Sequence, residues 1–257
     1  SASVSEDKEV QADLVRQYAE DGYDLIMGHG GEYRSAFETV SEEYPNIQFA
    51  LVTSHPGNNK NLGGLAVRAD ESGYLAGVLA ALKTETGKVA YIGGEVYPST
   101  TEEATAFEKG AKDTNPEVTV SIVWVESWSD QRKAQGIAED LVADDIDVLA
   151  VDADLAGLAA LQVAEKEGIM AIGWVSDQSS QAPNAIIGSV VQNMSARMTE
   201  AAVLVEKGRW EGKQYRMGIQ EGVIDLIVVD GVLTAEEDTQ IATIKDDIIT
   251  GQVDTLP

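Results

Sequence analysis

Short apolar runs alternate with segments of helical periodicity along almost the whole chain, and this alternation limits the possible folds more than any other feature. The runs that read as strands lie at residues 23–28, 47–52, 88–94, 118–125, 146–152, 168–175 and 185–191. The helical segments lie at residues 8–21, 32–43, 71–82, 101–113, 130–143, 155–167 and 194–206. Strands and helices that alternate at this spacing predict an α/β fold, with parallel sheets flanked by helices.

Size and composition agree with a large globular chain. The 257 residues suffice for one large domain or two lobes, and a hydrophobic content of 44% supplies a core. No apolar run approaches the roughly 18–20 residues of a membrane span, and the polar, acidic start of the chain does not predict a signal peptide. The absence of cysteine excludes disulfides and thiolate metal sites.

Charge is the strongest compositional signal. The chain has 44 Asp and Glu against 18 Lys and Arg, a net charge of −26. Such a surface repels phosphate backbones, so we expect no nucleic-acid partner. The acids are scattered along the predicted helices, which is typical either of a generally acidic protein or of adaptation to high salt, where screening removes the self-repulsion.

Five predicted strands end in glycine or small polar residues, in the loops GHGGEY, GGEVYP, ESWSD, DADLAG and WVSDQSS. Ligands of open α/β sheets bind at the carboxyl ends of the strands, so these loops predict a binding cleft. None of them has the spacing of a phosphate-binding loop.

Catalytic and metal-binding patterns are not found in the sequence. His29 faces the predicted cleft and is a candidate ligand contact, while His55 reads as a turn residue, and neither has the spacing of a metal site. Asp152 and Asp154 form the best carboxylate pair, although Asp154 reads better as a helix cap. We therefore expect no enzyme activity, no cofactor and no metal.

Aromatic residues are few, so their positions are informative. Trp128 and Trp174 stand at strand ends, in the loops that face the predicted cleft, and precede Asp130 and Asp177, respectively. An aromatic face with a carboxylate acceptor suits a neutral heteroaromatic ligand, and sugars use the same pair of groups. Asp130 also fits a helix N-cap, which we favour. Trp124 and Trp210 read as a core residue and a surface residue.

Several segments together resemble one family. YDLIMGHGGEY with EEYPNIQFALV, ADESGYLAGVLAAL, GKVAYIGG, VWVESWSD, IGWVSDQ and GIQEGVIDL occur in the order and spacing of the basic membrane protein family of ABC-transporter substrate-binding lipoproteins. Members of this family bind purine nucleosides or free purine bases. The resemblance runs from about Lys8 to the C-terminus and implies a two-lobed type I periplasmic-binding-protein fold.

The resemblance also implies a site and a function. Trp128 is similar to the family's cleft aromatic, which stacks on the base, and Asp177 to an acid that accepts hydrogen bonds from the ligand. Trp174, Tyr33 and Asp154 are expected to line the cleft with His29 and Gly30. Val175 and Gln192 replace an acid and a lysine among the family's polar contacts, so a free base such as adenine is slightly favoured over a nucleoside.

The lobes are predicted as residues 1–68 with 193–217, and 69–192 with 218–257. The family's first strand and helix have no match before Lys8, so we expect either that its first βα unit is missing from this sequence or that another segment fills that place. The resemblance implies an extracellular, membrane-anchored location, an ABC permease as partner, and a lipid anchor outside these residues. Alternatives are a sugar-binding protein, a Rossmann-like enzyme, and an assembly subunit that accepts a strand at the incomplete sheet.

Overall fold

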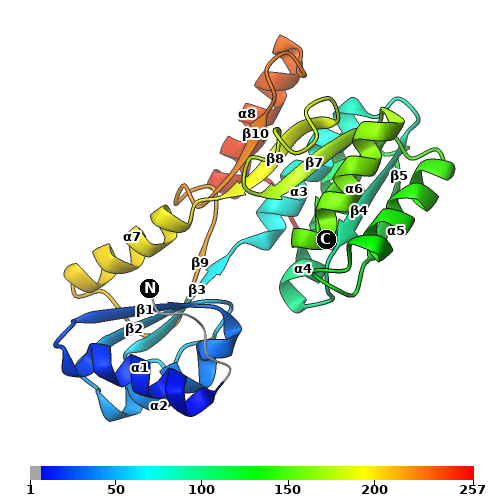
Figure 1. Ribbon diagram of the computed structural model, residues 1–257. Coiled ribbons are helices and arrows are strands. Elements are labelled where there is room, and N and C mark those ends of the chain that lie inside the picture. The colour runs from blue at the N-terminus through cyan, green and yellow to red at the C-terminus, as the bar shows by residue number, and fades with distance from the viewer. Residues whose placement is uncertain (1–6) are drawn as a thin grey trace. The chain divides into compact units, whose positions relative to one another are not determined.

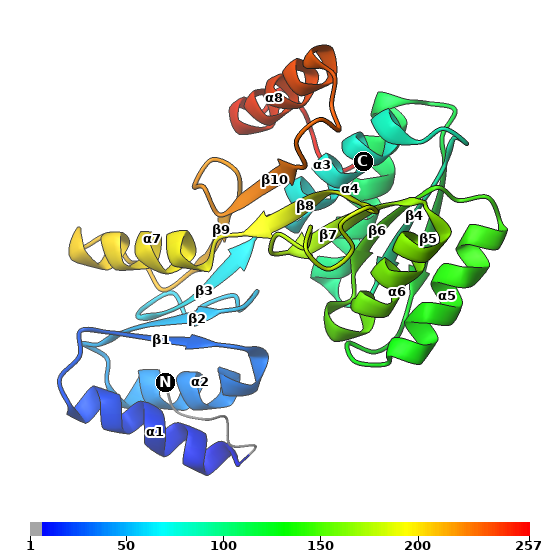
Figure 2. The same cartoon turned by 45° about the horizontal axis from the view of Figure 1, so that its top comes forward.

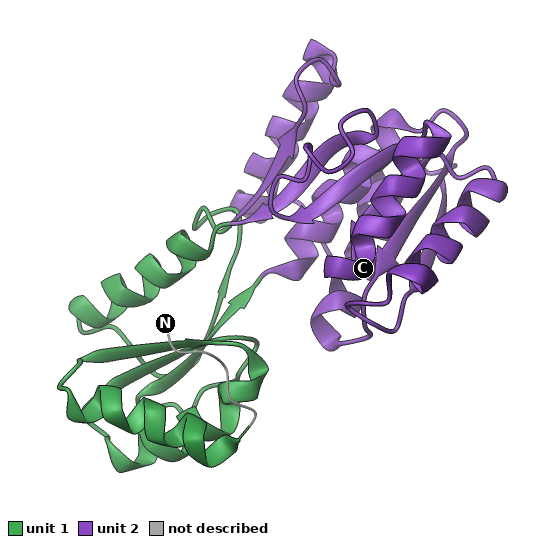
Figure 3. Ribbon diagram, in the orientation of Figure 1, with its two compact units in different colours: residues 1–67, 193–223 green, residues 68–192, 224–257 purple. Residues whose placement is uncertain are grey.

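The computed structural model describes residues 7–257 and divides the chain into two compact units, each described by itself (Figure 3). Unit 1 comprises residues 1–67 and 193–223, and unit 2 comprises residues 68–192 and 224–257. The chain therefore passes between units three times. The third passage follows Val223, a few residues beyond the boundary predicted at Met217.

Unit 1 is built on a parallel sheet in the order β1-β2-β3-β9. Its strands are β1 (Leu25–His29), β2 (Gln48–Val52), β3 (Leu62–Val67) and β9 (Gln214–Met217). Its helices are α1 (Lys8–Glu20), the short 3-10 helix η1 (Gly31–Tyr33), α2 (Arg34–Glu43) and α7 (Met194–Glu206). Helices α1 and α2 cover one face of this sheet and α7 lies over the other (Figure 1). Among the described strands, β1 pairs with β2 alone and forms an edge.

The core of unit 1 forms where the apolar faces of α1 and α2 meet the sheet. Val15 of α1 and Val40 of α2 are buried with Phe37, whose ring packs edge-to-face on Phe49 with the centroids 6.0 Å apart. The helix α1 begins at Asp7, whose carboxylate accepts hydrogen bonds from the backbone N–H groups of Glu9 and Val10. Such a cap satisfies N–H groups that have no partner within the helix.

Unit 2 is built on a larger sheet in the order β10-β8-β7-β6-β4-β5, in which all neighbours are parallel except β10 and β8. Its strands are β4 (Lys88–Gly93), β5 (Thr119–Trp124), β6 (Val148–Asp152), β7 (Met170–Val175), β8 (Ile186–Gln192) and β10 (Ile224–Val228). Its helices are α3 (Ala69–Lys83), α4 (Pro98–Thr114), α5 (Gln131–Ala143), α6 (Asp154–Glu167) and α8 (Ala235–Thr250). Helices α5 and α6 cover one face of this sheet, and α3 and α4 cover the other (Figure 2).

Helices α3 and α4 pack unusually closely because glycines line their contact. A Cβ atom added at Gly73 of α3 would lie 2.0 Å from the backbone oxygen of Glu103, and one at Gly110 of α4 would lie 2.2 Å from that of Tyr74. Only glycine allows the two backbones to come this near. This contact places Glu103 on the inner face of α4, above the sheet.

The predicted α/β class is confirmed, and each predicted strand and helix occurs near its expected position. The sequence analysis did not predict β3, β9, β10 or α8. Strand β3 contains Gly63 and Gly64, which suggest a loop, but a Cβ at Gly64 would lie 2.0 Å from the backbone oxygen of His55. Close backbone approach therefore explains that glycine in a strand. No helix in residues 7–257 is long and apolar enough to cross a membrane.

Candidate functional site

The carboxyl ends of β5, β6 and β7 form the most strained edge of unit 2. Glu126 and Asp154 follow β5 and β6, and Val175 is the last residue of β7; their φ values are 59°, 47° and 67°, in the left-handed region. This conformation is unusual for any residue with a side chain and most unfavourable for a β-branched one such as Val175. Backbone strain of this kind concentrates at functional sites, so this edge is the candidate site of unit 2.

A hollow of about 120 Å³ opens at this edge. Its lining combines carboxylate, amide and hydroxyl groups with an indole: Val151, Asp152, Asp154, Gly157, Trp174, Val175, Ser176 and Gln178. The side chain of Gln178 is fixed there, because its Oε1 accepts a hydrogen bond of 3.0 Å from the backbone N–H of Trp174. The hollow is therefore rich in hydrogen-bond acceptors.

A buried acid lies beneath the hollow. Glu103, only 4% exposed, accepts hydrogen bonds from the Tyr91 hydroxyl at 2.7 Å and from the Trp174 indole Nε1 at 3.1 Å. It is also hydrogen-bonded to Asp152. The four side chains come from α4, β4, β7 and β6, so the network ties one helix to three neighbouring strands.

Burial dominates the titration of this network. It raises the pKa of Glu103 well above its usual 4.5, and the charge of Asp152 raises it further. Burial also raises the pKa of Asp152 to about 6. Both shifts have the same physical cause, because two neighbouring carboxylates in a dry site are poorly solvated and repel each other.

Trp128 lies in the loop after β5. Its ring stacks on that of Tyr97, with centroids 6.5 Å apart and an angle of 7° between the planes, and it packs over Gly94. Its backbone oxygen accepts a hydrogen bond from Ala156 of α6 at 3.0 Å, which connects this loop to the helix that begins at Asp154. The two aromatic rings thus belong to the same edge as the hollow.

The structure brings two of the predicted residues of unit 2, Trp174 and Asp154, to the hollow and leaves Asp177 outside its lining. The side chain of Asp177 is exposed and accepts a hydrogen bond from the backbone N–H of Ser179 at 2.9 Å. Trp174 is only 3% exposed and its N–H is already bonded to Glu103. The ligand contacts assigned to these residues stay predictions.

Two helix caps were predicted after strands of unit 2. Asp130 caps α5 as expected, since its carboxylate accepts a hydrogen bond of 3.0 Å from the backbone N–H of Lys133. The prediction that Asp154 caps α6 is wrong. Ala153 holds the cap position without a side-chain hydrogen bond, and Asp154 is the first helical residue, with its carboxylate at the hollow. Its left-handed backbone accounts for this.

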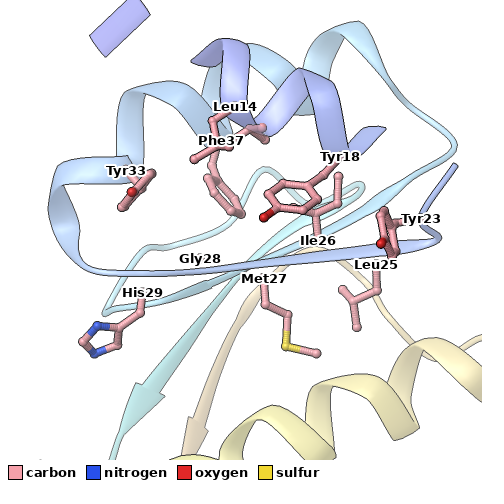
Figure 4. A pocket seen from close by; sticks show the side chains of 11 residues that line it. Leu14, Tyr18, Tyr23, Leu25, Ile26, Met27, Gly28, His29, Tyr33 and Phe37 are labelled. Atoms are coloured by element: carbon pink, nitrogen blue, oxygen red, sulfur yellow. The ribbon is translucent and has the colours of Figure 1, made fainter. Parts of the chain in front are cut away.

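Unit 1 has a larger and more apolar hollow, of about 560 Å³, along the free edge of β1. Figure 4 shows the rings of Tyr18 and Phe37 over one face of β1, and Met27 and His29 pointing to the other. His29 and Tyr33, both predicted site residues, line this hollow, whereas Gly30 lies next to it in sequence with φ 106°. Four of the seven predicted residues thus line a hollow, two in each unit, and Trp128, Asp177 and Gly30 line neither of these hollows.

His55 differs from its prediction as a turn residue. It is 5% exposed, its Nε2 lies 3.1 Å from the Glu38 carboxylate, and its Nδ1 accepts a hydrogen bond from the backbone N–H of Gly57. It has a structural role within unit 1. Residues 7–257 contain no group of three or more His, Cys, Asp or Glu side chains that could hold a metal ion.

Sequence reasoning did not identify Glu103. It lies within the acidic stretch TEEATAFEKG, in which any of several acids could have been the buried one. The helical period offered a signal, because Glu103 is four residues before the buried Phe107 and thus on the same helix face. Its partners Asp152 and Trp174 are distant in the sequence.

Similarity to known proteins assigns the class of fold. An ABC-transporter solute-binding protein of Aeropyrum pernix superposes with a TM-score of 0.77 at 19% identity, covering 97% of this chain and 82% of that one. The fold is that of α/β solute-binding proteins. The chain belongs to the family described as ABC transporter substrate-binding protein, PnrA-like, whose model matches residues 1–255. This confirms the predicted family.

Individual relatives have different names. A solved transcriptional activator of the comK gene from Bacillus halodurans has a TM-score of 0.86 at 25% identity, over 96% of this chain and 86% of that one. A purine-binding protein of Brucella abortus is 28% identical over 82% of this chain and 60% of its own length. The chain spans 60–66% of the length of the first curated relatives that it matches.

Proposed function

We propose that this chain binds a purine base or nucleoside as the substrate-binding component of an ABC importer. The observation that carries this proposal is the hollow of unit 2, which is lined by the carboxyl groups of Asp152 and Asp154, the Gln178 amide and the Trp174 indole. A purine offers N–H groups to such acceptors and a flat face to the neighbouring aromatic rings. Family membership and the purine-binding relative of Brucella abortus support the same ligand class.

The roles of the residues follow from this ligand. Trp128, whose ring is half-buried at the edge of the sheet, stacks on the base. Asp177 accepts hydrogen bonds from the ligand, and Asp154 and Trp174 contribute through the hollow that they line. In unit 1, Tyr33, His29 and Gly30 are the residues that we propose as ligand contacts. An amide at Gln192 and an apolar side chain at Val175 offer less to a ribose than charged groups, which favours a free base.

A role in an ABC importer also implies a location and a protein partner for this chain. The chain acts outside the membrane, delivers its ligand to an ABC permease, and is held at the cell surface by a lipid anchor outside these residues. Halophilic adaptation accounts for the net charge of −26. The same charge disfavours DNA as a partner of this chain, whatever the role of the relative named as a transcriptional activator.

A sugar is the second candidate ligand. A protein of Haloferax volcanii named as an ABC-transporter glucose-binding protein is 26% identical over 94% of this chain and 61% of its own length. Carboxylates, an amide and an indole suit sugar hydroxyl groups as well as purine nitrogens. The ligand panel below therefore includes both classes.

The test is calorimetric titration of the purified chain with adenine, adenosine, glucose and ribose, at low and at molar salt. We expect adenine to bind at micromolar concentration or below, with adenosine weaker. Trp128→Ala should weaken adenine binding more than tenfold, or about 1.4 kcal/mol. The matched control is Trp210→Ala, because Trp210 stacks on Tyr215 in unit 1 and does not line the hollow of unit 2. A glucose response without an adenine response would replace the purine by a sugar.

A further inference from the structure

The buried network beneath the hollow of unit 2 has two members that line the hollow and two that do not. Asp152 and Trp174 line it, whereas Glu103 and Tyr91 lie behind them. Glu103 contacts both lining residues, through the hydrogen bond from the Trp174 indole at 3.1 Å and through its bond to Asp152. Any change in the charge of Glu103 therefore acts directly on the wall of the hollow.

Acidic groups surround Glu103. Asp152 on β6 and Asp154 on α6 act on the pair as charges, and Tyr91 on β4 acts as a hydrogen-bond donor. On α3, which packs along α4, Glu71 is paired with Arg68 at 3.6 Å and Asp70 accepts a hydrogen bond from the Thr255 hydroxyl. With acids as the charges that act on it, a buried carboxyl pair is stabilised by keeping a proton rather than by an ion pair.

We propose that Glu103 is a positioning residue of the purine site, an inference that rests on the function proposed above. Glu103 shares one proton with Asp152 and thereby holds the Asp152 carboxylate and the Trp174 indole in the arrangement that binds the ligand. With one proton on the pair, neutral Glu103 donates to Asp152, and Asp152 keeps the negative charge at the wall of the hollow. That carboxylate then accepts an N–H of the ligand.

Ligand affinity should therefore depend on pH in both directions. A second proton neutralises Asp152 on the acid side and removes the acceptor for the ligand. Loss of the shared proton on the alkaline side breaks the hydrogen bond between the two acids and leaves two repelling charges beneath the indole. We expect a bell-shaped profile, with at least a tenfold loss of adenine affinity on each side of its maximum.

Glutamine can reproduce the neutral form of Glu103. Its carbonyl oxygen can accept the Trp174 N–H, its amide can donate to Asp152, and the Tyr91 hydroxyl can turn to donate to Asp152. Glu103→Gln should restore most of the affinity that Glu103→Ala loses, and it should abolish the alkaline fall. Glu108→Gln is the matched control on the same helix, because Glu108 forms a surface pair with Lys112 at 3.0 Å. It should keep the wild-type profile.

The experiment combines adenine titration across pH with the indole N–H resonance of Trp174, assigned by Trp174→Phe. In the ligand-free wild type this resonance should move with pH on the alkaline side, and in Glu103→Gln it should not. An indole resonance that ignores pH, or a Gln variant that loses binding as completely as the Ala variant, overturns the proposal. If the indole titrates but neither adenine nor adenosine binds at any pH, the shared proton stands and the proposed function fails.

Discussion

The two units of this protein differ in how completely they are packed and in how much charge they carry. Unit 1 has 15 acidic residues (Asp and Glu) and 9 basic residues (Lys and Arg), which gives a net charge of −6. Unit 2 has 29 acidic and 9 basic residues, which gives a net charge of −20. Unit 1 has a hollow of about 560 Å³ along the edge strand β1, and unit 2 a hollow of about 120 Å³ above a closed network. The more acidic unit is thus the more tightly built one.

The unit with the larger net charge therefore does not have the larger hollow. The hollow of unit 2 lies at the ends of β6 and β7, each of which has a neighbouring strand on both sides in the six-stranded sheet. In unit 1, the hollow lies along β1, which has one neighbour among the described strands, and the rings of Tyr18 and Phe37 lie over one face of this strand (Figure 4). The predicted absence of a first βα unit concerns this same sheet and stays a prediction, as does the alternative of strand addition.

The largest expected effect is the loss of stability when a buried phenylalanine in each unit is replaced by alanine. Phe107 of unit 2 is fully buried, so Phe107→Ala should destabilise unit 2 by about 3–5 kcal/mol. Phe37 of unit 1 is 2% exposed but borders the large hollow, so Phe37→Ala should cost unit 1 less, about 3 kcal/mol, because less new cavity forms. Hydrogen exchange under denaturant resolves the units separately. Equal losses would contradict the difference in packing.

The next effect is opposite pH dependence in the two units. The folded pKa of Glu103 is raised, so unit 2 binds more protons when folded and should lose stability as pH rises from about 4.5 through that pKa, by at most about 1.4 kcal/mol per pH unit. In unit 1, a hydrogen bond from Arg34 lowers the pKa of Glu38, so that unit should lose stability as pH falls below about 4.5.

Glu103→Gln should make the stability of unit 2 independent of pH above about 6 while leaving unit 1 unaltered. Unit-resolved hydrogen exchange at several pH values measures both slopes. If the stability of unit 2 still changes steeply with pH in Glu103→Gln, a group other than Glu103 causes that dependence.

A smaller effect, about 1 kcal/mol, is expected from backbone strain. Val175 has φ 67° and is 53% exposed, so Val175→Gly should stabilise unit 2 by releasing that strain, partly offset by the entropy of glycine. Val96 is a similarly exposed valine, at 59%, whose φ is not positive. Val96→Gly should be neutral or destabilising. Thermal melts of both variants measure the change in stability. A loss of stability in Val175→Gly would mean that the valine side chain contributes more to stability than the backbone strain costs.

The smallest effect, on the order of 0.5 kcal/mol, should come from salt. Raising salt from about 0.1 M to about 1 M shortens the screening length from about 10 Å to about 3 Å. Repulsion among exposed acids is therefore reduced, and unit 2, with the larger net charge, should gain more than unit 1. Protection factors measured at both salt concentrations give the gain in stability of each unit. An equal gain in both units would mean that their difference in net charge does not affect how salt changes their stability.

Much of the fold could be predicted because periodicity is local. Each of the seven predicted strands occurs, since apolar runs of that length pair in a parallel sheet in almost any context. Strand β3 was missed because Gly63 and Gly64 resemble a turn, and their use in a strand depends on His55 and Trp210, which approach from elsewhere. Strands β9 and β10 and helix α8 were also missed.

The candidate site was predictable in part. The loops of Trp128 and Trp174 were expected at the carboxyl ends of strands, and both lie there. The role of Asp154 as a cap was wrong because the left-handed backbone of that residue depends on its surroundings. Glu103 was missed because its contact with Trp174 spans 71 residues of sequence.

The sequence by itself determined the class of fold, the family and the strand-end loops, because these depend on residue order and local periodicity. Only the tertiary structure decided which of the 44 acids are buried, which of the predicted site residues line a hollow, and that Glu103 and Asp152 lie together in one network. The physical reason is that the charge state of a carboxyl group depends on the groups that surround it in space, and here those groups come from α4, β4, β6 and β7.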